Sequence, residues 1–260
     1  MSCEFKTWKA YWEFEQAVKF KNRYIKDTTT DGFLSTVLCT AKSRQKQVRS
    51  GRIFLRSQLG HGWMPEYHEN EYVFDIPCPF PPERMTPLKN MPSEGRANPK
   101  GIPYLYLATN KETAMAEVRP WIGSFISVGQ FKTLRNLRLI DCSKNLGGED
   151  FFFEEPPSQE WEKIIWSHID HAFSKPVNPS DIVADYVLTQ LIAELFKSAN
   201  FDGIIYRSSL GTGLNVVLFD IESAEIIKCS LFAVKAVSFD FQETTNPYFL
   251  RKHYRKDSTT

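Results

Sequence analysis

Glu117 is the first residue whose type and position suggest chemistry. The apolar spacing predicts a helix over residues 111–118, on which Glu117 shares the inward face with Ala114 and Val118. A carboxylate on an apolar face is costly unless it has a partner or a task. Glu117 is therefore a candidate functional acid. The alternative is an ordinary, partly exposed acid on a helix.

Arg96 and a pair of serines supply further polar groups. Arg96 stands in a turn-rich stretch at 95–101, and its planar guanidinium is suited to bidentate binding of a phosphate or carboxylate. Ser208 and Ser209 follow a short apolar run and precede a glycine-containing turn and Asn215, which makes this strand end a candidate small-molecule site. The alternatives are a solvated loop arginine and a plain β-hairpin, in which Gly and Ser are common.

Short predicted elements must position these residues. A buried strand is expected at residues 104–108, after an irregular, proline-rich segment at 77–103 that is a candidate wall of a cleft. Thr109 and Glu112 have the spacing of a capping box, which predicts that the helix carrying Glu117 begins there and stops before Pro120.

The rest of the chain is helix-rich at the front and strand-rich at the back. Residues 8–48 are expected to be mostly helical, with a break at 28–32. An acidic loop, a candidate lid or partner-binding surface, is expected at 147–157. Further helices are predicted at 158–173 and 180–199, and strands at 203–206, 214–219 and 234–241. This order lacks a β-α-β rhythm and favours an α+β domain with a mixed sheet.

The composition is that of an ordinary globular protein, with 42% apolar and 24% charged residues, which is enough to build a core without disulfides or metals. The formal net charge of +1 argues against a polybasic nucleic-acid binder. A basic stretch at 44–52 is interpreted as a solvated helix face. Five singly spaced cysteines favour a reducing compartment over a disulfide framework. No apolar run has the length of a membrane span, so we expect a cytoplasmic protein without membrane or nucleic-acid partners.

Together, the motifs resemble the RES domain family, which is named for its Arg, Glu and Ser. The resemblance covers about residues 50–240. It rests on Gly95-Arg96-x-Asn98-x-x-Gly101-x-x-x-x-Tyr106, Thr113-Ala114-x-Ala116-Glu117-Val118, and Asp202-Gly203-Ile204-Ile205-Tyr206-x-Ser208-Ser209 followed by Asn215. Arg96, Tyr106, Glu117 and Ser208 match the family's functional positions. In addition, Phe54-Leu55-Arg56 is similar to the arginine-bearing strand that opens the domain.

The resemblance implies a mixed β-sheet core like that of ADP-ribosyltransferases and cleavage of the nicotinamide–ribose bond of NAD. NAD would be the substrate, with no further cofactor and no metal, and the acceptor would be water, phosphate or a protein. It also implies a toxin with a cognate antitoxin, and a homodimer. The corresponding division is a helical extension at 1–48, a catalytic domain at 49–242 and a tail at 243–260.

The resemblance also implies roles for individual residues. Glu117 would stabilise the ribosyl cation, Arg96 and Arg56 would grip the pyrophosphate or the nicotinamide ribose, Tyr106 would stack on the nicotinamide, and Ser208 would orient a ribose hydroxyl or the amide. Ser209 and Asn215 are further NAD-binding candidates. The sequence departs from the family at Ala97, where a bulky residue is common, and at Gln58, where a second arginine is common.

Three other hypotheses are compatible with parts of the sequence. Arg56-x-x-x-x-His61 has the spacing of HEPN-type ribonuclease toxins, although the flanking glycines suit a turn better than a helix. A non-catalytic binding module on the same fold is a second alternative, and it is disfavoured because all four family positions are occupied. A metal site at His168-x-Asp170-His171 is a third, without a further Cys/His pair to support it.

Overall fold

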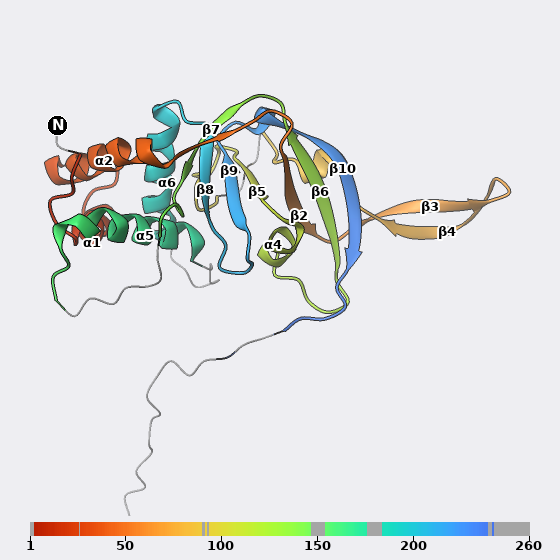
Figure 1. Cartoon of the computed structure of the whole chain (residues 1–260). Coiled ribbons are helices and arrows are strands. Elements are labelled where there is room, and N and C mark those ends of the chain that lie inside the picture. Colours follow the sequence, from red (N-terminus) through yellow and green to blue (C-terminus); the bar gives the residue numbers. More distant parts are fainter. Residues whose placement is uncertain are drawn as a thin grey trace, which may run out of the picture.

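The computed structural model describes residues 3–25, 27–89, 92, 94–146, 154–175, 184–238 and 241. Its centre is an eight-stranded mixed sheet with the strand order β1-β7-β8-β9-β5-β2-β6-β10 (Figure 1). The strands are β1 (Gln45–Val48), β2 (Ile53–Leu59), β5 (Leu105–Ala108), β6 (Phe125–Thr133), β7 (Leu137–Asp141), β8 (Gly203–Arg207), β9 (Leu214–Leu218) and β10 (Ala224–Ala233). β7 and β8 are parallel, whereas β8 and β9 are antiparallel. The predicted α+β class with a mixed sheet is confirmed.

The sheet is weakly joined in its middle. β5 pairs with β9 over four positions, but it pairs with β2 at one position only, Leu55 opposite Ala108. β2 in turn follows β6 over seven positions. The helix α4 (Lys111–Glu117) directly follows β5 and contacts β2, so its end lies close to this junction.

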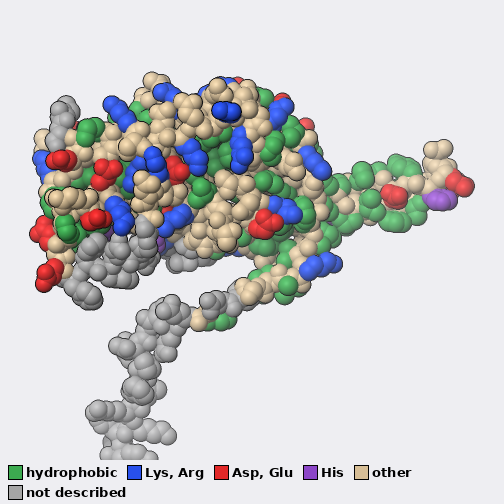
Figure 2. Space-filling view, viewed as in Figure 1, with side chains coloured by type: hydrophobic (Ala, Val, Ile, Leu, Met, Phe, Trp, Pro, Cys, Tyr) green, Lys and Arg blue, Asp and Glu red, His purple; other side chains and the backbone are tan. Residues whose placement is uncertain are grey.

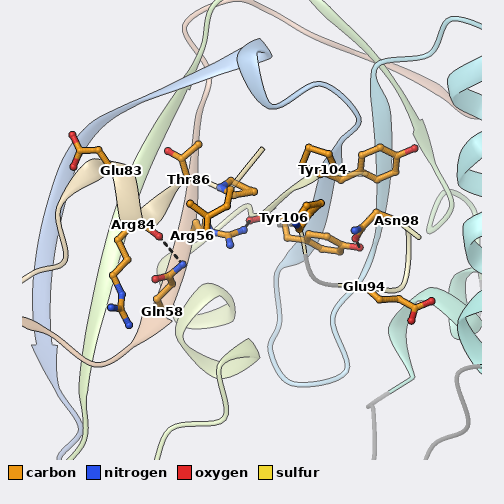
Figure 3. Close-up of a pocket in the computed structure, with 14 residues that line it drawn as sticks. Arg56, Gln58, Glu83, Arg84, Thr86, Glu94, Asn98, Tyr104 and Tyr106 are labelled. Atoms are coloured by element: carbon orange, nitrogen blue, oxygen red, sulfur yellow. Dashed lines mark hydrogen bonds between the residues drawn. The ribbon is translucent and has the colours of Figure 1, made fainter. Parts of the chain in front are cut away.

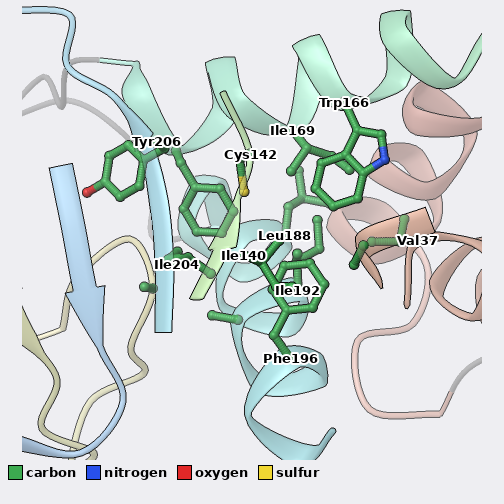
Figure 4. Packing of buried hydrophobic residues seen from close by; sticks show 14 of the residues in the cluster. Val37, Ile140, Cys142, Trp166, Ile169, Leu188, Ile192, Phe196, Ile204 and Tyr206 are labelled. Atoms are coloured by element: carbon green, nitrogen blue, oxygen red, sulfur yellow. The ribbon is translucent and has the colours of Figure 1, made fainter. Parts of the chain in front are cut away.

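Four helices pack together at the β7–β8 end of the sheet (Figure 1). They are α1 (Ala10–Phe20), α2 (Thr28–Ala41), α5 (Trp161–Ser174) and α6 (Ala184–Ser198). Val37 of α2, Trp166 of α5 and Phe196 of α6 are fully buried in one hydrophobic cluster with Ile140 and Ile204 of the sheet (Figure 4). The N-terminal helices therefore share a core with the strands that carry the site.

The N-terminal segment differs from its sequence prediction in two places. The expected break at 28–32 is the first turn of α2, because the carboxylate of Asp27 caps the helix by accepting from the Thr30 amide at 2.7 Å. Residues 45–48 are strand β1 rather than helix, and β1 pairs with β7. The division into a helical extension at 1–48 and a catalytic domain at 49–242 stays a prediction.

The basic stretch at 44–52 is not a solvated helix face. Arg44 is buried, with its guanidinium carbon 4.5 Å from the centre of the Trp166 ring, and it donates to the carbonyl oxygen of Cys142. Desolvation lowers the pKa of this guanidinium. Arg44 thus ties β1 to α5 and to the end of β7.

Further elements were placed wrongly or missed, and they include β6 and β7, where no strand was predicted. Residues 234–238 are irregular, and the strand predicted at 234–241 lies earlier, as the edge strand β10, whose alternating polar residues conceal it. Residues 239 and 240 are outside the described part of the chain. A second sheet consists of the hairpin β3 (Gly62–His68) and β4 (Glu71–Cys78), which projects from the body (Figure 1). It carries many exposed apolar side chains (Figure 2), and Pro65 and Pro77 disguise its strands in the sequence.

The cysteines also differ from expectation. Cys3 and Cys39 form a disulfide that joins the N-terminal segment to α2, with a Cα–Cα distance of 5.6 Å. Cys78, Cys142 and Cys229 are free thiols. The 36-residue separation of the bonded pair gave no signal in the sequence, because only the packing of the helices brings the two residues together.

Several predictions fall partly or wholly outside the described residues. They are the acidic loop at 147–157, of which 154–157 are described, the first residues of the helix predicted at 180–199, and the tail at 243–260. The proline-rich segment at 77–103 contains one short helix, α3 (Pro82–Met85), and is otherwise mostly irregular where it is described. Within the described ranges, none of the helices has the length and apolar character needed to cross a membrane.

Candidate active site

Glu117 and Arg96 line the same pocket, although 21 residues separate them in the sequence. The pocket has a volume of about 310 Å³. Tyr106 of β5, Ser209 and Asn215 of the β8–β9 region, and Ser174 and Lys175 at the end of α5 also line it. The fold thus gathers most of the sequence-predicted polar groups around one cavity, which opens beside the end of α4.

Two hydrogen bonds orient the carboxylate of Glu117. The Ser208 hydroxyl and the Asn215 side-chain amide both donate to Oε1, each at 2.7 Å. Within the described part of the chain, no side chain donates to the other oxygen, Oε2. Glu117 is exposed and does not lie on the buried apolar face that the helix pattern predicted, because α4 ends at this residue. A fixed carboxylate with an open oxygen can face a positively charged group.

Neighbouring residues place α4 and its acid. The helix is capped by Asn110, whose side chain accepts from the Thr113 amide at 2.8 Å, and not by Thr109 as the capping box predicted. Thr109 instead accepts from the backbone amide of Leu214 at 2.9 Å. The buried hydroxyl of Thr113 accepts from the Gly213 amide at 2.9 Å, which fixes the β8–β9 turn against α4.

Arg96 lies between α5 and α6. Its guanidinium donates to the carbonyl oxygen of Ala172 at 2.9 Å, and its own carbonyl accepts a hydrogen bond from Thr189 of α6 at 2.5 Å. Gln190 of α6 donates to the carbonyl oxygens of Gly95 and Asn98, at 3.0 and 3.2 Å. These contacts hold the loop that carries Arg96 against α5 and α6.

The hydroxyl of Tyr106 makes two hydrogen bonds. Its hydroxyl donates to Asn98 Oδ1 at 2.7 Å and accepts from the Ala97 amide at 2.9 Å. Burial raises the pKa of this phenol, so the hydroxyl stays protonated. A Cβ atom on Gly95 would lie 2.5 Å from the Tyr106 hydroxyl, so only glycine permits this arrangement. The ring remains as a wall of the pocket.

Arg56 does not join Glu117 in the same pocket. It lines a second cavity of about 610 Å³, together with Gln58, Tyr104 and residues of the proline-rich segment (Figure 3). Its guanidinium donates to the Tyr106 carbonyl at 3.2 Å, and its buried Nε has no hydrogen-bond partner among the described residues. Burial lowers the pKa of Arg56. Tyr106 lines both cavities, so it stands between Arg56 and Glu117.

The two serines have different partners. Ser208 donates to Glu117 and accepts from the Leu210 amide at 3.1 Å, whereas Ser209 donates to the carbonyl oxygen of Ser174 on α5 at 2.9 Å. Ser208 therefore belongs to the immediate surroundings of the carboxylate. Ser209 joins the β8–β9 turn to α5 on the other side of the pocket.

Comparison with known proteins identifies the family to which the chain belongs. The model of the RES domain matches residues 74–241, which is more than half of the chain. The chain belongs to the RES domain family. The matched region contains Arg96, Tyr106, Glu117 and Ser208, while Arg56 lies ahead of it.

Comparison with solved structures gives a match to a toxin–antitoxin complex. A chain in the crystal structure of the M. tuberculosis MbcT–MbcA toxin–antitoxin complex is similar with 11% sequence identity and a TM-score of 0.38. The similarity covers 74% of the present chain and 90% of that chain. No curated protein sequence matches the chain. The RES assignment therefore rests on the family match.

One positioning pair in the RES region was missed. Asp170 of α5 is fully buried and accepts from the backbone amide and from Nε of Arg207, at 3.0 and 2.6 Å. The pair fixes the end of β8 immediately before Ser208. The sequence indicated that Asp170 is a buried acid, because it lies on a helix between the core residues Ile169 and Phe173. Its partner could not be identified, because Arg207 is 37 residues away.

The residues of the alternative metal and ribonuclease sites do not line the Glu117 pocket. His168, from the proposed metal cluster, packs its ring against those of Tyr11 and Trp12, and the described residues contain no group of three or more potential metal ligands. Arg56 lies on strand β2, and His61 lies between two strands against Phe125, so neither occupies the helical setting of HEPN-type ribonucleases.

Proposed function

We propose that this RES protein is an NAD-consuming enzyme that cleaves the bond between nicotinamide and ribose, and that it acts as the toxin of a toxin–antitoxin pair. The observation that carries the proposal is the oriented carboxylate of Glu117 in one pocket with Arg96 and Tyr106. A cognate antitoxin and a homodimer are part of the same proposal, by analogy with the family. NAD is the substrate, and no further cofactor is needed.

The chemistry fits a carboxylate better than a strong acid. The C1′–N bond breaks, and its electron pair neutralises the positive nitrogen of nicotinamide, which leaves as a neutral molecule. The ribose is left with oxocarbenium character, which an anion such as Glu117 stabilises. An oxygen of water, phosphate or a protein side chain then bonds to C1′ and releases its proton where it carries one.

The other residues bind and orient. The guanidinium of Arg96 faces the diphosphate, for which its planar donors are suited. The ring of Tyr106 stacks on nicotinamide, and its hydroxyl is occupied by Asn98. Arg56 provides a second buried cation on the far side of Tyr106. Ser208 and Asn215 hold Glu117 in place for the ribose.

The proposal is tested by mixing the purified full chain with NAD and following nicotinamide release, with structured RNA in a parallel incubation. We expect nicotinamide from NAD and intact RNA. The mass of the second product distinguishes the acceptors: free ADP-ribose, ADP-ribose carrying an added phosphate when inorganic phosphate is present, or a modified polypeptide. Absence of nicotinamide with cleavage of RNA would contradict the proposal.

Removing either donor to Glu117 should slow the reaction without abolishing it. For Ser208→Ala and Asn215→Ala, we expect kcat to fall about tenfold or more each, since one hydrogen bond to a charged group contributes about 1.5–3 kcal/mol. KM for NAD should change less than kcat, because the carboxylate acts on charge that develops during bond breaking. Steady-state kinetics on both variants measure this. If Ser208→Ala or Asn215→Ala lowered kcat by the same factor in a protein that already carries Glu117→Gln, the positioning role would be contradicted.

A further inference from the structure

A third cavity adjoins the Glu117 pocket and has no role in the function proposed so far. Its volume is about 230 Å³, and it lies among α1, the end of α5 and the start of α6. Arg96 and Lys175 line both cavities, so the two meet at these cations. Helix α1, which supplies one wall, precedes the residues matched by the RES family model.

The wall formed by α1 presents an aromatic surface. The indole of Trp12 is 37% exposed and lies 4.7 Å, centroid to centroid, from the ring of His168. His168 also stacks on Tyr11 at 5.5 Å. Burial and the nearby His171 lower the pKa of His168, so the ring is uncharged at neutral pH. Flat, neutral ring systems of this kind bind a purine by stacking.

One turn further along α1, an acid faces the same cavity. Glu15 lines the cavity and pairs with Lys19 at 2.8 Å, with 26% of the Glu15 side chain exposed. A carboxylate can accept hydrogen bonds from the two hydroxyls of a ribose. It also repels a phosphate on the 2′ oxygen, which is how acidic residues favour NAD over NADP in other folds.

The order of these groups matches the order of groups in NAD. We propose that the cavity lined by Trp12, Glu15 and His168 binds the adenosine half of NAD, and that Glu15 selects NAD over NADP. The inference rests on the proposed function. The nicotinamide ribose lies against Glu117, the diphosphate spans Arg96 and Lys175, and the adenosine extends toward α1. The N-terminal helix is then part of the substrate site rather than an independent extension.

The test compares NAD with nicotinamide mononucleotide, which has the same scissile bond and lacks the adenosine half. For Trp12→Ala, we expect kcat/KM for NAD to fall about tenfold or more, as for loss of a base-stacking aromatic, while cleavage of the mononucleotide keeps its rate. For Glu15→Gln, we expect the ratio of kcat/KM for NADP to that for NAD to rise about tenfold, because the substitution removes the carboxylate that repels the 2′-phosphate. Glu13 is an exposed acid on the same helix, and Glu13→Gln is the matched control. It should leave unchanged both the ratio of kcat/KM for NADP to that for NAD and the ratio of kcat/KM for NAD to that for the mononucleotide.

Binding of AMP gives a second readout that does not need turnover. Wild-type protein and Glu13→Gln should bind AMP with equal affinity in calorimetric titrations, and Trp12→Ala should bind it about tenfold more weakly. Because Glu15→Gln keeps the size of the side chain, it tests the site even if Trp12→Ala is unstable. Equal losses for NAD and the mononucleotide in Trp12→Ala, or an unchanged NADP ratio in Glu15→Gln, would overturn the inference. A wild-type protein that binds AMP through Trp12 and releases no nicotinamide would refute the proposed function instead.

Discussion

Glu117→Gln should reduce nicotinamide release from NAD by about 10²–10³-fold, the usual cost of removing one preorganised electrostatic group from an active site. The amide keeps the shape of the side chain and removes the negative charge. The loss should appear in kcat more than in KM, because the charge on the ribose develops only as nicotinamide leaves.

A control on the same helix separates this effect from a change in folding. Glu112 lies in the first turn of α4, and 70% of its side chain is exposed. Glu112→Gln should retain the parental rate, and both variants should melt within a few degrees of the parent, since neither carboxylate is buried. A Glu117→Gln protein that consumes NAD at the parental rate would show that another group stabilises the cation.

Gly203→Ala should be the most destabilising single change among the glycines of the sheet, costing about 3 kcal/mol or more of unfolding free energy. A Cβ on Gly203 would collide with the backbone carbonyl oxygen of Val217 and would lie 3.1 Å from the side chain of Leu139. Gly203 opens β8, which is hydrogen-bonded to β7 on one side and β9 on the other, so the backbone has no room to yield. Since β8 leads to Ser208, activity should fall with stability.

Gly32→Ala is the matched control for this prediction. Gly32 lies within α2, and a Cβ there meets no atom within 4 Å. Alanine in a helix is more stable than glycine by about 0.5–1 kcal/mol, so this variant should be as stable as the parent or slightly more so. Denaturant unfolding of both variants measures the difference. A Gly203→Ala protein with parental stability would contradict the close backbone approach at β8.

The local elements around the site could be predicted from the sequence because their signals are local. The apolar run before the site gave β5, and the spacing after it gave α4, with Thr109 mistaken for the cap that Asn110 supplies. Turn residues after β8 marked the segment that carries Ser208. The family pattern also placed Arg96 and Glu117 in one site, and they do line one pocket.

The supporting contacts could not be predicted, because they join residues far apart in the chain. Asp170 and Arg207 come from α5 and β8, Gln190 reaches the Arg96 loop from α6, and Arg44 stacks on Trp166. Arg207, Gln190 and Arg44 each have the sequence pattern of a solvated side chain, and the position of Asp170 on an apolar helix face does not identify its partner. These contacts follow from the packing of helices against the sheet, for which a single sequence gives no pairing information.

A crystal structure of Glu117→Gln soaked with NAD tests the central claim most directly, since the slow variant should retain the intact dinucleotide. The account predicts the nicotinamide ribose within hydrogen-bond distance of residue 117, with the ring against Tyr106 and the diphosphate against the guanidinium of Arg96. NAD bound with its nicotinamide ribose away from residue 117, or bound outside this pocket altogether, would contradict it.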